Sequence, residues 1–365
     1  MDKMILTAGP SITEKEIAYV TDAITNGHGE HWGDYIKWFE SSFARYIGVK
    51  HALATSSCTG ALHLALTALG IGKGDEVIVP DTSWVATASA ITYTGATPVF
   101  ADVLSDSWCI DIQSIENLIN ENTRAIIPVH LYGHPCEMNK LLELAKDYDI
   151  KIVEDAAPSV GTEYYGKKTG SFGDIACFSF QGAKILSTGE GGMLVTNNTE
   201  LFNNVKHYAD HGRSGVGFEI SSIGYKYKMS NLQAAMGLGQ LERIDDLVAK
   251  KREIYSWYRE CLEDVNEVYL NKRITDIEKP NYWMSSVVLM DAKVSRDDVM
   301  LQLKKKCVDS RPFFPPMSSF PMFDYYDNPV AKNIGANGIN LPSAHNLMHE
   351  DVKYVCGCLK DILAG

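Results

Sequence analysis

Short apolar runs rich in valine and isoleucine recur along the first two-thirds of the chain, and segments with helical spacing lie between them. Apolar runs of about four to eight residues with β-branched side chains predict buried strands. They fall at residues 76–80, 97–103, 125–129, 150–154, 175–180 and 193–196. Helical spacing is seen, for example, at residues 59–69 and 138–148. This alternation predicts an α/β domain with a mostly parallel sheet.

The last third of the chain has a different pattern. Residues 230–265 are almost continuously helical in their pattern, with opposite charges four residues apart, such as Asp246 and Lys250. A long helix of this kind often links two domains. The polar segment 271–281, which contains Pro280, is predicted to be a connecting loop.

A mixture of short strands and helices follows that loop. The pattern predicts a strand at residues 285–290 and helices at 296–306 and 350–363. We therefore expect a large domain at residues 1–245, whose N-terminal segment can pack on the second domain, and a smaller α+β domain at residues 246–365.

Composition and charge narrow the classes of function. The 365 residues are 45% hydrophobic and 22% charged, and the net charge is −12. An acidic balance argues against nucleic acid or an anionic membrane as a partner. The eight cysteines are scattered without CxxC spacing, and neither a signal sequence nor a long apolar run is found. We expect a cytoplasmic protein with reduced thiols, no membrane span and no metal site.

Lys184 is the first candidate for chemistry. It lies between the apolar runs at 175–180 and 193–196. A lysine between two buried strands is costly unless its charge or its nucleophilicity is used. One common use is an imine with an aldehyde cofactor.

Three further segments carry groups that such a cofactor needs. The small residues Ser57, Cys58 and Thr59 open a helix, whose N-terminus is a ready phosphate site, although a plain N-cap is the simpler interpretation. Asp155 ends an apolar strand and can pair with a protonated ring nitrogen or cap the next helix. Trp84 can stack on a flat ring or belong to the core.

The order and spacing of these segments resemble those of pyridoxal-phosphate enzymes of fold type I. More narrowly, the chain resembles the DegT/DnrJ/EryC1/StrS family of sugar aminotransferases nearly from end to end. The matching segments are 48–66, 72–102, 130–135, 154–157, 173–174, 178–180, 184, 188–192 and 224–242. The resemblance implies a large domain with a mixed, mostly parallel sheet of about seven strands and a small C-terminal α+β domain.

The resemblance also implies roles for residues. Lys184 falls on the lysine that binds pyridoxal 5'-phosphate and then moves a proton, while the cofactor passes through its pyridoxamine 5'-phosphate form. Asp155 falls on the partner of the pyridine nitrogen, and Trp84 on the aromatic that stacks on the ring. The phosphate-binding positions fall on Ser57, Cys58, Thr59 and Ser179. Cys58 occupies a position that is commonly glycine.

Two positions depart from the family pattern. Lys226 stands where the family usually has an asparagine that reaches the cofactor phosphate from the neighbouring subunit, and an ammonium suits a phosphate. The other interpretation of Lys226 is a solvated surface lysine. Pro158 stands where the family usually has Gln, His or Glu near the 3'-oxygen of the cofactor, and proline cannot supply that contact.

The resemblance implies a keto-sugar substrate, L-glutamate as donor and a homodimer with shared sites. Segments 309–314 and 338–343 are most similar to GDP-perosamine synthases, which aminate GDP-4-keto-6-deoxy-D-mannose. Candidate substrate residues are His31, Trp32 and Arg311, each with a structural role as the alternative. UDP- or dTDP-linked sugars, amination at C3 or C4, and 8-keto-3-deoxyoctulosonate stay open. The product is expected to enter surface polysaccharide or lipopolysaccharide.

Two other functions fit the sequence less well. A sugar 3-dehydratase of this family carries histidine in place of the lysine, so Lys184 argues against it. A cofactor-binding regulator without turnover has no supporting feature, because Lys184 and Asp155 are both present and no basic patch is found.

Overall fold

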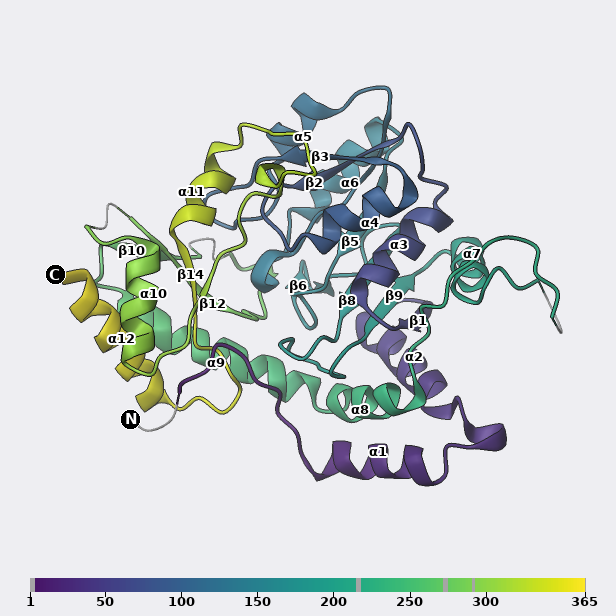
Figure 1. The fold of residues 1–365 in the computed structure, drawn as a ribbon, viewed down its shortest axis with the longest axis horizontal. Coiled ribbons are helices and arrows are strands. Elements are labelled where there is room, and N and C mark those ends of the chain that lie inside the picture. The colour runs from purple at the N-terminus through teal and green to yellow at the C-terminus, as the bar shows by residue number, and fades with distance from the viewer. Residues whose placement is uncertain (1–3, 215–217, 272–274, 291–292, 365) are drawn as a thin grey trace.

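The computed structural model describes residues 4–214, 218–271, 275–290 and 293–364, and Figure 1 shows its arrangement. A seven-stranded sheet forms the centre, in the order β1-β9-β8-β5-β4-β2-β3. Its strands are β1 (His51–Thr55), β2 (Glu76–Pro80), β3 (Thr97–Ala101), β4 (Thr123–Ile126), β5 (Lys151–Asp155), β8 (Ile175–Ser179) and β9 (Gly192–Thr196). Each lies on one of the predicted runs or, for β1, just before the predicted phosphate helix.

The sheet is mixed and mostly parallel. The pairs β2/β3, β2/β4, β4/β5 and β5/β8 are parallel, whereas β9 is antiparallel to both β8 and β1. The predicted fold class is therefore confirmed, including the number of strands. Because β9 alone is reversed, β9 begins at the edge of the sheet where the other six strands end.

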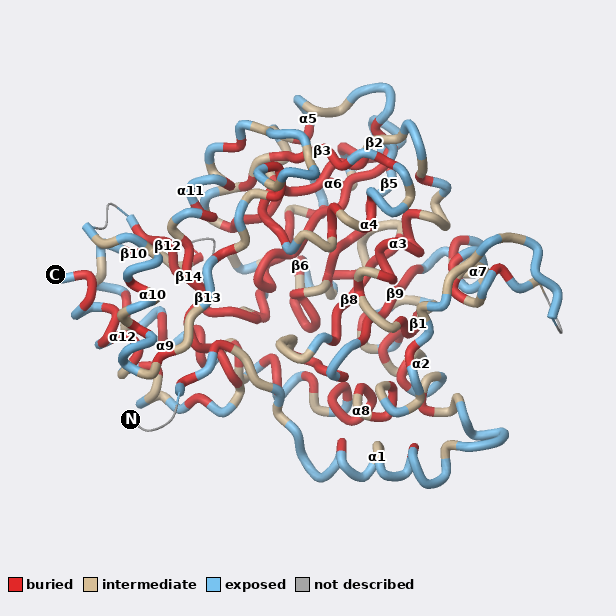
Figure 2. The backbone as a smooth tube through the Cα atoms, in the orientation of Figure 1, coloured by how far each residue is buried: buried red, intermediate tan, exposed pale blue. Residues whose placement is uncertain are grey.

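Helices cover both faces of this sheet. The bounds are α2 (Asp34–Ile47), α3 (Cys58–Ala68), α4 (Ala86–Thr94), α5 (Ile112–Leu118), α6 (Met138–Asp147) and α7 (Thr199–Ala209). Successive residues of β5 show the two layers, since Ile152 packs with α6 and Val153 packs with α3. Burial on both faces explains why the strands are continuous apolar runs. Figure 2 shows these strands buried and most of α1 (Glu14–Thr25) exposed.

A second part of the chain has its own sheet, in the order β10-β12-β14-β13. Its elements are α9 (Ile244–Leu262), β10 (Val268–Leu270), β12 (Ser285–Leu289), α10 (Arg296–Lys305), β13 (Arg311–Pro312), α11 (Pro329–Asn337), β14 (Gly338–Leu341) and α12 (His349–Ala364). The N-terminal segment packs here, where Ile5 pairs with Val308. Both ends of the chain lie beside this part in Figure 1. The boundary at residues 245/246 stays a prediction.

The remaining elements connect the two parts. A small sheet joins β11 (Glu278–Lys279) to the hairpin of β6 (Glu163–Tyr164) and β7 (Lys167–Lys168). The predicted loop 271–281 therefore contains a short strand, and its residues 272–274 lie outside the described residues. Single turns of 3₁₀ helix occur at Gly29–His31, Leu131–Gly133 and Met317–Ser319.

The helical pattern at residues 230–265 forms two helices, not one. Helix α8 (Asn231–Leu241) ends before Arg243, and α9 starts after it. Arg243 has φ of −127° and donates to the carboxylate of Glu16 at 2.7 Å, so its side chain is turned toward α1. This contact is made by a residue far away in the sequence, which helical spacing alone could not show. Within the described part of the chain, no helix combines the length and apolar character needed to cross a membrane.

Candidate active site

The candidate residues gather at one edge of the seven-stranded sheet. Strands β1, β2, β5 and β8 end there, and β9 begins there. In open α/β sheets, ligands bind outside the carboxyl ends of the strands. The loop from Phe180 to Gly191, which carries Lys184, joins β8 to β9 at this edge.

The backbone of this loop is fixed on both sides of Lys184. The amide of Phe180 donates to the carbonyl of Gly191 at 2.9 Å, and the amide of Lys184 donates to Gln181 at 2.8 Å. Burial of the Lys184 side chain lowers its pKa to about 8, while the nearby charge of Asp155 acts in the opposite direction. A larger fraction of this amine is therefore neutral near pH 7 than for an exposed lysine.

The start of α3 lies against the first residue of β9. Ser57 is the N-cap, and its hydroxyl accepts a hydrogen bond from Gly60 at 3.1 Å. A Cβ atom on Gly192 would lie 2.6 Å from the carbonyl carbon of Ser57 and 2.7 Å from the amide nitrogen of Cys58. Glycine at 192 thus lets the helix start approach the sheet edge, where it presents the N–H groups of its first turn.

Two candidate phosphate residues take different positions around this helix start. Cys58 is buried, and burial raises the pKa of its thiol well above the usual value, so the thiol stays protonated and apolar contacts surround it. Only the backbone amide of Cys58 suits an anion. Ser179 ends β8 and pairs across the sheet with Gly192, which places it beside Ser57.

Asp155 is a buried carboxylate at the end of β5, and it has a defined orientation. One oxygen accepts from the hydroxyl of Thr87 at 2.8 Å, and the other accepts from the amide of Ala157 at 3.1 Å. Thr87 in turn contacts the hydroxyl of Ser83 at 3.1 Å. Burial raises the pKa of Asp155, and the bond from Thr87 and the charge of Lys184 oppose that effect. A positive group beside this carboxylate would favour its charged form.

Trp84 lies just before α4, three residues from Thr87. Its carbonyl accepts a hydrogen bond from the amide of Thr87 at 3.2 Å. Its side chain is 62% exposed, so its ring is open to a ligand instead of belonging to the core. One neighbour is Phe314 from the second part of the chain, with ring centroids 5.8 Å apart. The structure thus brings Trp84 to the same sheet edge as Asp155.

Two residues at this edge were not identified from the sequence. Thr87 has no signal of its own, because a helical threonine is common and its partner Asp155 is far away in the sequence. Trp283 lies just before β12, and its ring centroid is 3.5 Å from the amine nitrogen of Lys184. Nothing in the local pattern around residue 283 indicates that the second part of the chain reaches Lys184.

Lys226 lies in an extended segment beside the end of β1. The amide of Ser56 donates to the carbonyl of Tyr227 at 2.6 Å, and Lys228 pairs with Thr55. The rings of Tyr225 and Tyr227 stack on one another and contact His63 on α3. Side chains alternate along an extended segment, so Lys226, which is exposed, points away from α3 of its own chain.

The three candidate substrate residues are not joined to Lys184 within one chain. His31 and Trp32 are exposed between α1 and α2, and His31 contacts Asp34 at 2.9 Å. Figure 1 places this connection far from the strand ends of β5 and β8. Arg311 is exposed on β13, three residues before Phe314.

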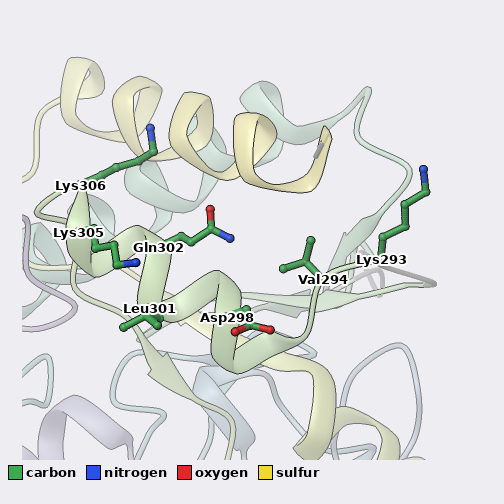
Figure 3. A pocket seen from close by; sticks show the side chains of 7 residues that line it. All are labelled: Lys293, Val294, Asp298, Leu301, Gln302, Lys305 and Lys306. Carbon is green, nitrogen blue, oxygen red and sulfur yellow. The ribbon is translucent and has the colours of Figure 1, made fainter.

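A surface hollow of about 460 Å³ lies elsewhere, along α10. Figure 3 shows its lining side chains, which come from α10, from Lys293 and Val294 before it, and from Lys306 just after it. None of the candidate residues lines it. The site is therefore identified by the chemistry at the sheet edge and not by this hollow.

Comparisons with known proteins show which family the chain resembles. The model of the DegT/DnrJ/EryC1/StrS aminotransferase family matches residues 10–360. The GDP-perosamine synthase of Escherichia coli O157:H7 is 41% identical over 362 residues, or 98% of each chain. The GDP-perosamine synthase of Caulobacter vibrioides is 39% identical over 364 residues, again 98% of each. The crystal structure of the aminotransferase TlmJ from Streptoalloteichus hindustanus has a TM-score of 0.94 at 30% identity, covering 99% of both chains.

Members of this family depend on pyridoxal phosphate, and the residues at the sheet edge fit that cofactor. A phosphate fits the start of α3, which the glycine at 192 allows to approach the sheet edge. A protonated ring nitrogen fits the buried carboxylate of Asp155, and an aldehyde fits the amine of Lys184. The lowered pKa of that amine agrees with a nucleophile.

Proposed function

The chain belongs to the DegT/DnrJ/EryC1/StrS aminotransferase family, and from that premise we propose that it aminates a nucleotide-linked 4-keto-6-deoxy sugar with L-glutamate as donor. It is a pyridoxal-phosphate-dependent sugar aminotransferase. A substrate like GDP-4-keto-6-deoxy-D-mannose is supported by relatives named GDP-perosamine synthase that match nearly the whole chain. The observation that carries the proposal is Lys184, an amine with a lowered pKa at the sheet edge, beside Asp155.

When bound, pyridoxal phosphate supplies an aldehyde for amines and a ring that accepts carbanion charge. In our proposal, the amine of Lys184 would hold the cofactor through its aldehyde group. When it is not bound to the cofactor, the same amine would take up the proton from the α-carbon of glutamate and later give it up again. With its pKa lowered to about 8 by burial, Lys184 can act as both base and acid near neutral pH.

Asp155 is proposed to face the ring nitrogen and keep it protonated. A buried carboxylate stabilises a positive charge more strongly than an exposed one, because the local dielectric is low. Thr87 fixes the orientation of this carboxylate through its 2.8 Å hydrogen bond. Trp84 is proposed to cover one face of the ring.

The phosphate is assigned to the start of α3 and to Ser179. The amides of Cys58 and Thr59 and the hydroxyl groups of Ser57, Thr59 and Ser179 are the proposed contacts. Lys226 points away from α3 of its own chain, and we propose that it reaches the phosphate site of a second copy. The enzyme would then be a homodimer with shared sites. We propose that His31 and Trp32, which are exposed between α1 and α2, also act on substrate in the site of a second copy.

Arg311 is proposed to pair with the diphosphate of the substrate, since a guanidinium suits phosphate geometry. Its exposed position three residues before Phe314 supports this role. Pro158 is buried, and its carbonyl accepts from Asn281 at 3.0 Å. Proline cannot supply the contact that the family usually makes at this position. UDP- or dTDP-linked sugars, C3 amination and 8-keto-3-deoxyoctulosonate are therefore included in the test. We place the enzyme in the cytoplasm, on a route to surface polysaccharide or lipopolysaccharide.

The test is the visible spectrum of the cofactor-loaded protein during a full cycle. L-Glutamate should bleach the band of the lysine-bound cofactor, and the correct keto sugar should restore it. GDP-4-keto-6-deoxymannose is tried first, followed by UDP- and dTDP-linked keto sugars and the keto-octulosonate. A band that ignores glutamate would contradict the proposed donor. Restoration by another keto sugar alone would replace the proposed substrate.

A further inference from the structure

The ring of Trp283 touches the site lysine from a distant part of the chain. The amine nitrogen of Lys184 lies 3.5 Å from the centroid of the indole ring, within the range of a cation–π contact. The indole N–H of Trp283 donates to the carbonyl of Ala183 at 2.7 Å. Trp283 therefore contacts both the side chain of Lys184 and the backbone just before it.

The position of Trp283 is fixed by a buried asparagine. Asn281 accepts from the amide of Trp283 at 2.8 Å, and its own amide group donates to Pro158 and Val160 at 3.0 and 2.9 Å. A Cβ atom on Gly133 would lie 1.7 Å from the side-chain oxygen of Asn281, so this approach requires glycine at 133. Trp283 itself is only 6% exposed.

The face of an aromatic ring attracts a positive charge, and the attraction grows when water is excluded. It therefore favours the ammonium form of a lysine, whereas burial favours the neutral amine. The titratable groups that act on Lys184 are Asp155 and Cys58. Trp283 adds an uncharged group, and its contribution does not change with pH.

We propose that Trp283 is a positioning residue for Lys184, whose amine rests on the indole face whenever it is not bound to the cofactor. The inference rests on the proposed role of Lys184 and extends it. The ring keeps the freed amine beside the reacting atoms and stabilises it after it has taken up a proton. Since Trp283 precedes β12, the second part of the chain would contribute directly to the proton transfer.

The experiment measures the pKa of Lys184 in the full chain loaded with pyridoxamine phosphate, where the lysine is free. The rate of Lys184 acetylation by acetic anhydride is followed against pH by peptide mass spectrometry. Trp283→Leu removes the ring and should lower the pKa of Lys184 by about half a unit to one unit. Trp283→Phe keeps an aromatic face and should produce a smaller shift.

Turnover gives a second reading of the same variants. Trp283→Leu should lower kcat about tenfold and leave the KM for glutamate within about twofold, because the lost contact concerns the lysine and not the donor. The matched control is Trp257→Leu on α9, where Lys250 lies 4.4 Å from the ring centroid. That variant should leave the pKa of Lys184 and kcat unchanged.

An unchanged Lys184 pKa in Trp283→Leu would overturn the inference. Equal shifts in Trp283→Leu and Trp283→Phe would also overturn it, because the N–H bond to Ala183 and not the ring face would then be responsible. Turnover by Lys184→Ala would overturn the proposed function as well. An inactive Lys184→Ala combined with an unshifted Trp283→Leu contradicts the inference alone.

Discussion

Among the described residues, two lysines have strongly lowered pKa values, and they lie in different regions. Lys184 lies in the loop between β8 and β9, and burial lowers its pKa to about 8. Lys251 lies on α9, is 2% exposed, and has its pKa lowered by burial to about 7. Judged by desolvation alone, Lys251 would be the stronger candidate for a reactive amine.

The surroundings of the two amines differ. Lys184 faces a carboxylate, a thiol and an indole ring at the edge of a sheet where strands end. Lys251 donates to the backbone carbonyl of Ser343, where the chain leaving β14 crosses the N-terminal segment. Burial of His345, together with the nearby charge of Lys251, lowers the pKa of His345 to about 3.

The comparison teaches that a perturbed pKa identifies a reactive amine only together with groups that could use it. At Lys184, the charged and aromatic neighbours converge on space outside the strand ends. At Lys251, the amine on α9 donates to one backbone carbonyl, that of Ser343, inside the second part of the chain. We assign chemistry to the first lysine and a structural role to the second.

The largest expected effect separates the two lysines directly. Lys184→Ala should reduce turnover by about 10³-fold or more, because nucleophile and proton carrier are both lost. The bound cofactor should also show the spectrum of the unlinked form. Steady-state kinetics and the visible spectrum measure both effects. Wild-type turnover in this variant would show that the lysine assignment is wrong.

The next variant tests the carboxylate that distinguishes Lys184 from Lys251. Asp155→Asn keeps the shape and removes the charge, so kcat should fall by about 10²-fold. The control is Thr87→Val, which keeps the charge of Asp155 but removes one hydrogen bond to it, worth about 1.5 kcal/mol, and should cost about tenfold. Equal losses in the two variants would mean that the charge of Asp155 has no special role.

Lys251 is expected to influence stability instead of turnover. The pKa of Lys251 is lower in the folded chain, about 7, than the value of about 10.4 expected when unfolded. Between these values the unfolded state binds more protons, so stability rises with pH and is lost as pH falls toward 7. Between pH 7 and pH 9, the free energy of unfolding of wild type should rise by on the order of 2 kcal/mol relative to that of Lys251→Met.

Denaturant unfolding of the two proteins at several pH values measures this difference. Lys251→Met should keep turnover within about twofold of wild type, because the residue lies outside the site. If the difference in unfolding free energy between the two proteins stays constant from pH 7 to pH 9, the lowered pKa of Lys251 is contradicted. A large loss of turnover without a loss of stability would undo the comparison between the two lysines.

The smallest effect concerns an exposed lysine. Lys226→Ala should weaken cofactor retention about tenfold without removing the covalent link, because one charged contact to the phosphate is lost. Lys206→Ala, at an exposed lysine on α7, serves as the control. Dialysis followed by the visible spectrum measures retention. Equal retention in both variants would leave Lys226 as a solvated surface residue.

The sequence predicted the sheet well because its strands are buried on both faces and stand out as apolar runs. For β2, the predicted and observed bounds agree at residues 76–80. The common location of Lys184, Asp155 and Trp84 has a related reason, since each lies at or after the carboxyl end of a strand at the same edge. Their roles stay predictions. Ser57 was predicted both as an N-cap and as a phosphate residue, and the structure shows that its hydroxyl caps the helix.

What the sequence could not supply were contacts between distant segments. Trp283 reaches Lys184 only because Asn281 is held by carbonyls of the loop after β5. Thr87 orients Asp155 from the first turn of α4, 68 residues earlier in the sequence. At the break before α9, Arg243 donates to Glu16, which is far away in the sequence. Spacing along one segment carries no information about such partners.

The central claim is that Lys184, and not Lys251, carries the cofactor, and one measurement tests it directly. The protein loaded with pyridoxal phosphate is reduced with sodium borohydride, which fixes the cofactor to its lysine, and its peptides are mapped by mass spectrometry. We expect the pyridoxyl group on the peptide that contains Lys184. A pyridoxyl group on Lys251 or on any other lysine, with Lys184 unlabelled, would contradict the account.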